Sequence, residues 1–192
     1  MKKLIFLFVS AMLFAAAAEE VFNEKKLVAE GQALERSGKT KEAGAFYLQA
    51  LEKPLSPAVR RTFLNRCSMF AGNEQEKKDF LLRASMVSGA SPTETYRTFL
   101  LLGFLHVRNA PDKALGYFLN FGEEKKVAPG LVYNGYLSAG RIMESQKKYQ
   151  QALEYYRKSL TAGKAVAYKF NYSAAEEAIK NVEGLIQNEN PK

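Results

Sequence analysis

The sequence predicts an all-α protein, a right-handed α-solenoid of about four helix pairs closed by a C-terminal capping helix. Three observations lead to this expectation. Apolar residues recur at helical spacing from Phe22 onward, and no stretch shows the sustained polar–apolar alternation of a strand. Small or polar turns, such as residues 37–39 and 72–73, divide the helices into short pairs. Paired short helices in succession call for a search for an internal repeat.

Composition supports a folded domain and argues against nucleic-acid binding. Of the 192 residues, 47% are hydrophobic and 25% are charged, a globular rather than a disordered balance. The formal net charge is +8, but the basic residues are scattered and form neither a dense patch nor a nucleic-acid motif. The surplus suits an acidic partner or an anionic surface.

The N-terminus predicts export. Lys2 and Lys3 precede an apolar run over residues 4–14, and small residues follow at Ala16 and Ala18. This order is typical of a secretory signal peptide over residues 1–18, with the mature chain beginning at Glu19. The alternative is an uncleaved membrane anchor, but the apolar stretch of roughly 15 residues is short of the about 20 needed to span a bilayer. We therefore expect a periplasmic or secreted protein without stable membrane insertion after cleavage.

Cysteine usage limits how the domain is stabilised. Cys67 is the only cysteine, so no intramolecular disulfide can form and packing must hold the fold. No cysteine follows the alanine run, so the mature end cannot be lipidated there.

Two segments, 24–57 and 133–166, share one spacing of small and aromatic residues. In each, a glycine is followed twelve residues later by an alanine, four further on by a tyrosine, and then by another small residue. The residues are Gly31, Ala43, Tyr47 and Ala50 in the first segment, and Gly140, Ala152, Tyr156 and Ser159 in the second. Small residues let two helices approach closely, and an aromatic one turn beyond lies on the same helix face.

This spacing resembles the tetratricopeptide repeat family, whose 34-residue unit is a helix–turn–helix. The resemblance implies units at about 24–57, 58–91, 92–130 and 131–166 within a domain covering residues 19–192. The second unit has Asn65 and Lys77 where small residues are usual. The third keeps Gly103, Ala114 and Phe118 around a longer turn.

A last helix is predicted over residues 173–188. Ser173 and Glu176 have the spacing of a capping box, and the apolar residues beyond them form one stripe. We expect this helix to cover the exposed face of the final unit, as arrays of repeats require.

No residue set predicts catalysis, a cofactor or a metal. His106 is the only histidine, and Cys67 stands in line with apolar residues at helical spacing. Each is better read as structural than as a base or a nucleophile. Because convergent titratable groups are not visible, we expect a non-enzymatic protein without cofactors.

The resemblance instead implies a concave groove lined by the first helices of successive units. The residues that it places there are Val28, Gln32, Arg36, Arg66, Met69, Phe104, Arg108, Leu137 and Arg141. Arginines beside apolar residues suit a peptide that carries carboxylates, although they also fit ordinary surface charge.

The function expected from these features is a scaffold or assembly factor of the cell envelope that binds a protein or peptide partner, and the basic surplus suits an acidic one. A self-associating structural component is the alternative. An enzyme or small-molecule binder built on the same frame is disfavoured, because no site chemistry is visible.

Overall fold

The computed structural model describes residues 23–121 and 124–189. All regular structure in these ranges is helical, which confirms the predicted all-α class. The predicted signal peptide and the start of the mature chain lie outside the described residues.

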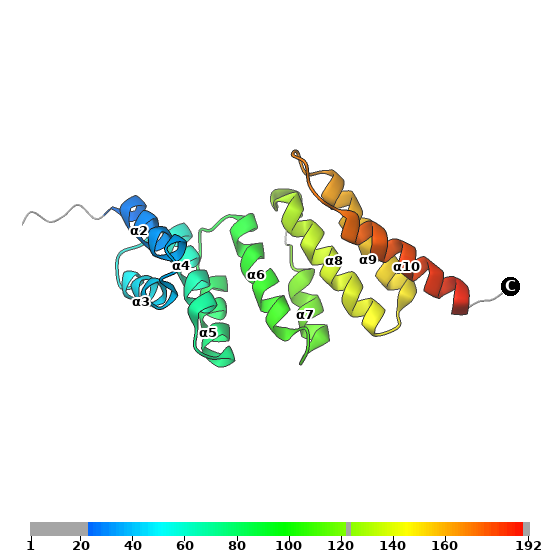
Figure 1. The fold of residues 1–192 in the computed structure, drawn as a ribbon, viewed down its shortest axis with the longest axis horizontal. Helices are drawn as coiled ribbons and strands as arrows, with labels where there is room; N and C mark the ends of the chain where they lie inside the picture. Colours follow the sequence, from blue (N-terminus) through cyan, green and yellow to red (C-terminus); the bar gives the residue numbers. More distant parts are fainter. Residues whose placement is uncertain (1–22, 122–123, 190–192) are drawn as a thin grey trace, which may run out of the picture.

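The helices follow one another as antiparallel pairs in a row, shown in Figure 1. The pairs are α2 (Glu24–Arg36) with α3 (Thr40–Ala50), α4 (Pro57–Phe70) with α5 (Glu74–Ser85), α6 (Pro92–His106) with α7 (Pro111–Phe118), and α8 (Pro129–Ser145) with α9 (Tyr149–Lys164). A short 3-10 helix, η1 (Glu124–Lys126), precedes α8, and α10 (Ser173–Glu189) ends the row. The fourth pair thus begins two residues before the predicted boundary at 131.

Local sequence signals explain where several helices begin. Proline stands in the first turn of α4, α6, α7 and α8, where its missing N–H costs no helical hydrogen bond. Asn23 and Asn73 cap α2 and α5 through their side chains. A capping box is present at Ser91 and Glu94, at the start of α6.

The capping box predicted at Ser173 is not formed. The backbone N–H of Ser173 donates to Asn171 Oδ1, and that of Glu176 donates to the Tyr172 carbonyl. The helix therefore begins one residue earlier than a Ser173 cap requires.

Within three of the pairs, an aromatic ring fills the space above a glycine. A Cβ at Gly31 would lie 2.4 Å from the Tyr47 ring, and Gly103 and Gly140 stand in the same relation to Phe118 and Tyr156. In the second pair Asn65 takes the glycine's place, and the smaller Leu81 replaces the ring. Because Leu81 is smaller than an aromatic ring, it leaves room for Asn65, which is larger than glycine, on the first helix of this pair.

Two hydrophobic cores lie along the row. One is built by α2 to α5, and the other by α6 to α10. Buried and half-buried polar side chains join them: Asn65 and Thr98 are hydrogen-bonded, and the Arg61 guanidinium donates to Thr95 Oγ1 and the Val87 carbonyl. Arg61 is only 2% exposed. We call Arg61, Asn65, Thr95 and Thr98 the polar seam.

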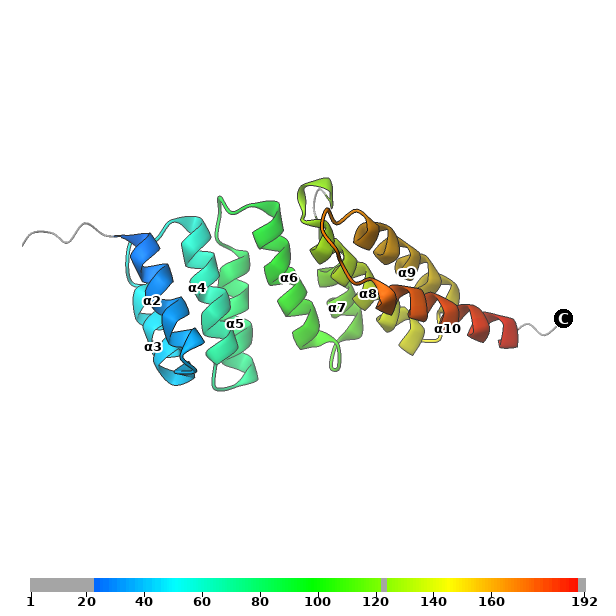
Figure 2. The same cartoon turned by 45° about the horizontal axis from the view of Figure 1, so that its top comes forward.

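The two layers of the row differ in how closely they pack. Among the described residues, the first helix α6 contacts both α4 and α8, whereas the second helices of successive pairs make fewer contacts. The loops that connect the pairs lie along one edge and the turns within the pairs along the opposite edge, as the two views agree (Figures 1 and 2). The exposed sides of the first helices therefore form one surface, which lies between the edge with the connecting loops and the edge with the turns.

Candidate functional site

The exposed surface of α2, α4, α6 and α8 is the candidate site, and we call it the first-helix face. Gln32, Arg66, Phe104 and Arg141 each directly follow the close-approach position of their pair. They therefore occupy equivalent positions on successive helices. Gln32, Phe104 and Arg141 are exposed, and Arg66 is half-buried.

At the N-terminal end of this face, α2 and α4 enclose a shallow pocket of about 290 Å³. Val28 and Gln32 line it together with Lys25 and Val59. Two of the predicted groove residues thus lie side by side, in a depression with apolar and polar walls.

The arginines of the face differ in their partners. Arg66 Nε lies 3.3 Å from the Glu35 carboxylate, and its Nη1 contacts Met69 Sδ at 3.6 Å. Within the described chain, Arg97 and Arg141 form no hydrogen bond or ion pair, and neither does Arg36. Arg97 and Arg141 are therefore available to an anionic ligand.

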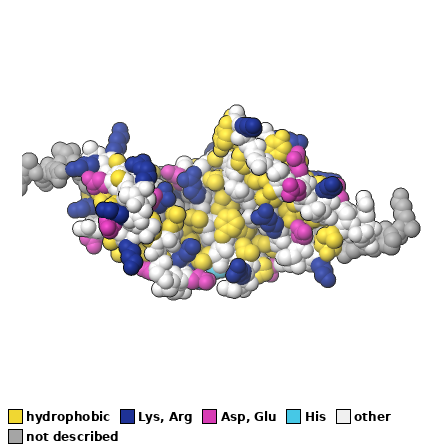
Figure 3. Space-filling view, viewed as in Figure 1, with side chains coloured by type: hydrophobic (Ala, Val, Ile, Leu, Met, Phe, Trp, Pro, Cys, Tyr) yellow, Lys and Arg dark blue, Asp and Glu magenta, His cyan; other side chains and the backbone are white. Residues whose placement is uncertain are grey.

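Exposed apolar side chains lie on the same face as these arginines. Phe104 is 54% exposed and Met69 is 59% exposed. Hydrophobic side chains gather over α6 and α8 on the side of the molecule seen in Figure 3, with basic side chains among them. A surface of this kind can exclude water around an ion pair.

Two residues predicted for the groove lie elsewhere. Leu137 is only 7% exposed and belongs to the second core, because α8 is flanked by α6, α7 and α9 and buries most of its surface. Arg108 lies beyond the end of α6, in the turn before α7. Between the exposed ends of α8, at Pro129 and Ser145, the exposed positions are Asn134 and Arg141.

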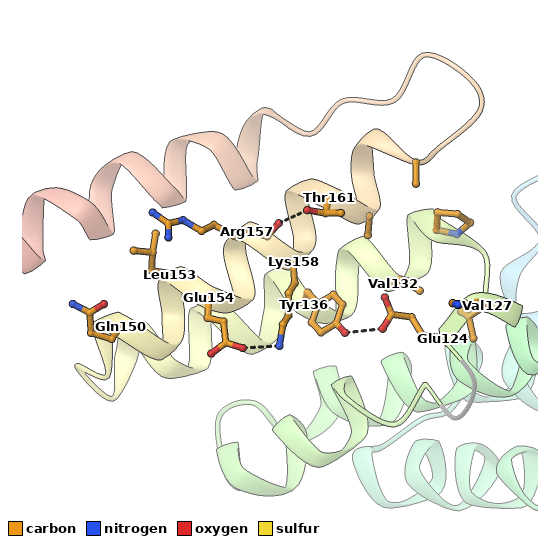
Figure 4. Close-up of a pocket in the computed structure, with 14 residues that line it drawn as sticks. Glu124, Val127, Val132, Tyr136, Gln150, Leu153, Glu154, Arg157, Lys158 and Thr161 are labelled. Atoms are coloured by element: carbon orange, nitrogen blue, oxygen red, sulfur yellow. Dashed lines mark hydrogen bonds and ion pairs between the residues drawn. The ribbon is translucent and has the colours of Figure 1, made fainter.

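A larger open pocket, of about 680 Å³, lies on the opposite side of the row and was not expected from the sequence (Figure 4). It is bounded by η1, the start of α8 and one stripe of α9. The second helix α7 has 8 residues, against 16 in α9, so part of α9 has no neighbouring second helix beside it. The sequence pattern did not predict that α7 would be short, so this space was not foreseen.

Four polar side chains of this pocket form two pairs with one another. Tyr136 donates to Glu124, and Lys158 Nζ lies 2.6 Å from Glu154 (Figure 4). Burial and the hydrogen bond to Glu124 raise the pKa of Tyr136, and the hydrogen bond to Glu154 raises that of Lys158. The pocket offers a ligand its apolar floor, including Val132 and Leu153, with Lys125 and Gln150 at its wall.

The residues tested for chemistry stand apart from one another. Burial lowers the pKa of His106, which stacks on Tyr117, and its Nε2 is buried with no hydrogen-bond partner within the described chain. Cys67 is buried in the first core, and burial raises its pKa to about 11. Across residues 23–121 and 124–189, no three His, Cys, Asp or Glu side chains cluster so that they could hold a metal ion.

Comparisons with known proteins inform the fold. No protein-family model matches the chain, and no curated protein matches it in sequence. The crystal structure of BtubC (BKLC) from P. vanneervenii is similar, with a TM-score of 0.61 at 12% sequence identity. The match covers 88% of this chain and 81% of that one. At this identity the likeness shows a shared helical fold.

Proposed function

We propose that the protein is a non-enzymatic interaction scaffold of the tetratricopeptide type, which binds a partner protein or peptide on its first-helix face. The observation that carries this proposal is the pair of arginines Arg97 and Arg141, which have no partner in the described chain and flank the exposed Phe104. They come from α6 and α8, two helices in contact.

The spacing of these groups supports a ligand that carries carboxylates on both sides of an apolar residue. Arg97 and Phe104 are seven residues apart on one helix, about 10 Å along its axis. Arg141 holds the position on α8 that is equivalent to Phe104, roughly 8–10 Å away at ordinary helix packing distance. Guanidinium groups bind carboxylates bidentately, and the apolar side chain between them removes water.

The proposal also includes where the protein acts. The signal-peptide pattern of residues 1–18 supports export to the cell envelope, where the mature domain would work as a scaffold or assembly factor. Its excess of basic residues favours an acidic partner and would speed association at low salt.

Charge reversal on the face tests this function. The mature protein is used as bait for an envelope extract, and each captured protein is then titrated against purified variants. Arg97→Glu with Arg141→Glu is expected to weaken binding at low and at physiological salt. Lys41→Glu with Lys77→Glu makes the same change in charge on the second helices α3 and α5 and should leave binding close to that of the unmodified protein. Equal affinity for both double variants would exclude the first-helix face as the binding surface.

Self-association is the second candidate, favoured by the exposed Leu185 on α10, the helix that ends the row. Sizing chromatography over a concentration series would then show a dimer that Leu185→Asp dissociates. A monomer at all concentrations would remove this candidate.

A further inference from the structure

The loop between α9 and α10 projects from the row, at the top of Figure 1. It spans residues 165–172, and Lys164 ends the helix before it. Figure 3 shows hydrophobic and basic side chains on this projection. Tyr168 is 71% exposed, and it forms no hydrogen bond or ring contact within the described chain.

The C-terminal part of this loop packs against the helices. The exposure of Tyr168 therefore does not result from a loop that lacks contacts. The Phe170 ring packs edge-on against Tyr133 at a centroid distance of 5.0 Å. Tyr172 lies against Gly163, where a Cβ would come within 3.0 Å of it. These two contacts fasten the chain to α8 and α9 and leave Tyr168 at the tip.

The charged side chains of the loop that carries Tyr168 are all basic. Residues 164–172 contain Lys164 and Lys169 and no acidic residue. Along the same edge, the α7–α8 connection adds Lys125, while its neighbour Glu124 is engaged by Tyr136. The α5–α6 loop, on that edge too, carries Met86, which is 78% exposed and is the most exposed of the large hydrophobic side chains described.

We propose that this edge docks on the surface of a membrane that contains anionic phospholipids, with Tyr168 and Met86 entering the interface and Lys164, Lys169 and Lys125 lying against the headgroups. Tyrosine favours the interface because its ring is apolar and its hydroxyl remains hydrated. Lysines close to an anionic leaflet bind it electrostatically. Combining an apolar anchor with basic residues is what peripheral attachment needs.

The shape of the edge favours a lipid surface over a protein pocket. Tyr168 and Met86 stand on separate projecting loops rather than in a depression, and a fluid interface receives such tips without a matching cavity. None of the helices described between residues 23 and 189 is long and apolar enough to cross a bilayer. Docking by this edge is independent of the first-helix face and leaves that face open to a partner.

A tryptophan reporter tests the docking, since the chain contains no tryptophan. Tyr168→Trp is mixed with vesicles of phosphatidylcholine alone or with phosphatidylglycerol added. Its emission should shift to the blue and resist acrylamide quenching only when phosphatidylglycerol is present. Asn109→Trp, in the α6–α7 turn on the opposite edge, is the matched reporter and should stay unshifted. No shift at position 168, or an equal shift at both positions, would overturn the proposal.

Vesicle co-sedimentation tests the lysines. Lys164→Gln with Lys169→Gln should weaken partition into phosphatidylglycerol vesicles about thirtyfold at low salt, and less at high salt. Lys147→Gln with Lys148→Gln removes the same charge from the opposite edge and should change partition less than threefold. An equal effect of the two variants would contradict the assignment. A blue shift of the Tyr168→Trp reporter with polyglutamate, but not with vesicles, would assign the edge to an acidic protein instead.

Discussion

The Tyr156 hydroxyl donates a hydrogen bond to the Glu144 carboxylate across the fourth helix pair. Glu144 stands four residues after Gly140, on which the Tyr156 ring rests. The first pair repeats the relation: burial and the facing Glu35 raise the pKa of Tyr47 to about 12. In the third pair Phe118 has no hydroxyl, and Val107 stands where the carboxylate would be. The tyrosine hydroxyl and the carboxylate therefore occur together or are both absent.

The hydrogen bond between Tyr156 and Glu144 should contribute measurably to stability. Tyr156→Phe keeps the ring over Gly140 but removes a bond to a charged acceptor, so the free energy of unfolding should fall by about 1–3 kcal/mol. Urea denaturation measures the change. Tyr149→Phe on the same helix, where the hydroxyl has no partner in the described chain, should shift the free energy by less than about 0.5 kcal/mol. Equal effects of the two variants would deny the bond a stabilising role.

A methyl group at Gly140 should be destabilising, because its Cβ would lie 2.4 Å from the buried Tyr156 ring. Gly140→Ala is expected to lower the free energy of unfolding by about 1–3 kcal/mol through overpacking. Gly184→Ala in α10 meets no atom within 4 Å and should raise stability by about 0.5–1 kcal/mol through helix propensity. Thermal unfolding of both variants checks the opposite signs, and a stable Gly140→Ala would show that the helices are not in closest approach there.

The polar seam should couple the two cores. Arg61→Met leaves the Val87 carbonyl and Thr95 without their buried donor, at a cost of about 1–3 kcal/mol. Hydrogen exchange should then show α2 to α5 opening before α6 to α10, because each half has its own core.

Arg60→Met is the matched control for the seam. Arg60 also donates to two carbonyls, those of Leu51 and Lys53, but it does so within the first core. This variant should leave the two halves exchanging as the unmodified protein does. Uniform exchange in Arg61→Met would mean that the row unfolds as one unit regardless of the seam.

Acid should destabilise the protein through His106. Burial lowers its pKa in the folded state below 6.5, and Lys113 and Lys78 act in the same direction, while Glu74 opposes them. As pH falls through 6.5, the unfolded chain therefore takes up a proton that the folded one does not, and stability decreases. Urea midpoints at pH 7.5 and 5.5 should differ less in His106→Phe, which keeps the stack on Tyr117. An unchanged difference would place the acid sensitivity elsewhere.

Part of the candidate site could be predicted from the resemblance to tetratricopeptide repeats. Gln32, Phe104 and Arg141 could be named because each follows a residue fixed by the small–aromatic spacing, and they are exposed in the structure. Leu137 could not be separated from them, because its burial depends on three helices that surround α8. The pairing of Arg66 with Glu35 and the pocket beside α9 likewise depend on helices from different pairs.

Sequence alone determined the helical class, the pairing of the helices and the glycines on which aromatic rings rest, since these depend on residues close together in the chain. Tertiary structure decided which serine caps a helix: the Ser-x-x-Glu spacing occurs at both Ser91 and Ser173, and only the first forms a capping box. It also decided which side chains remain exposed. Whether a side chain is buried depends on the helices that pack against it. The spacing of residues within one helix does not indicate which neighbouring helix will cover them.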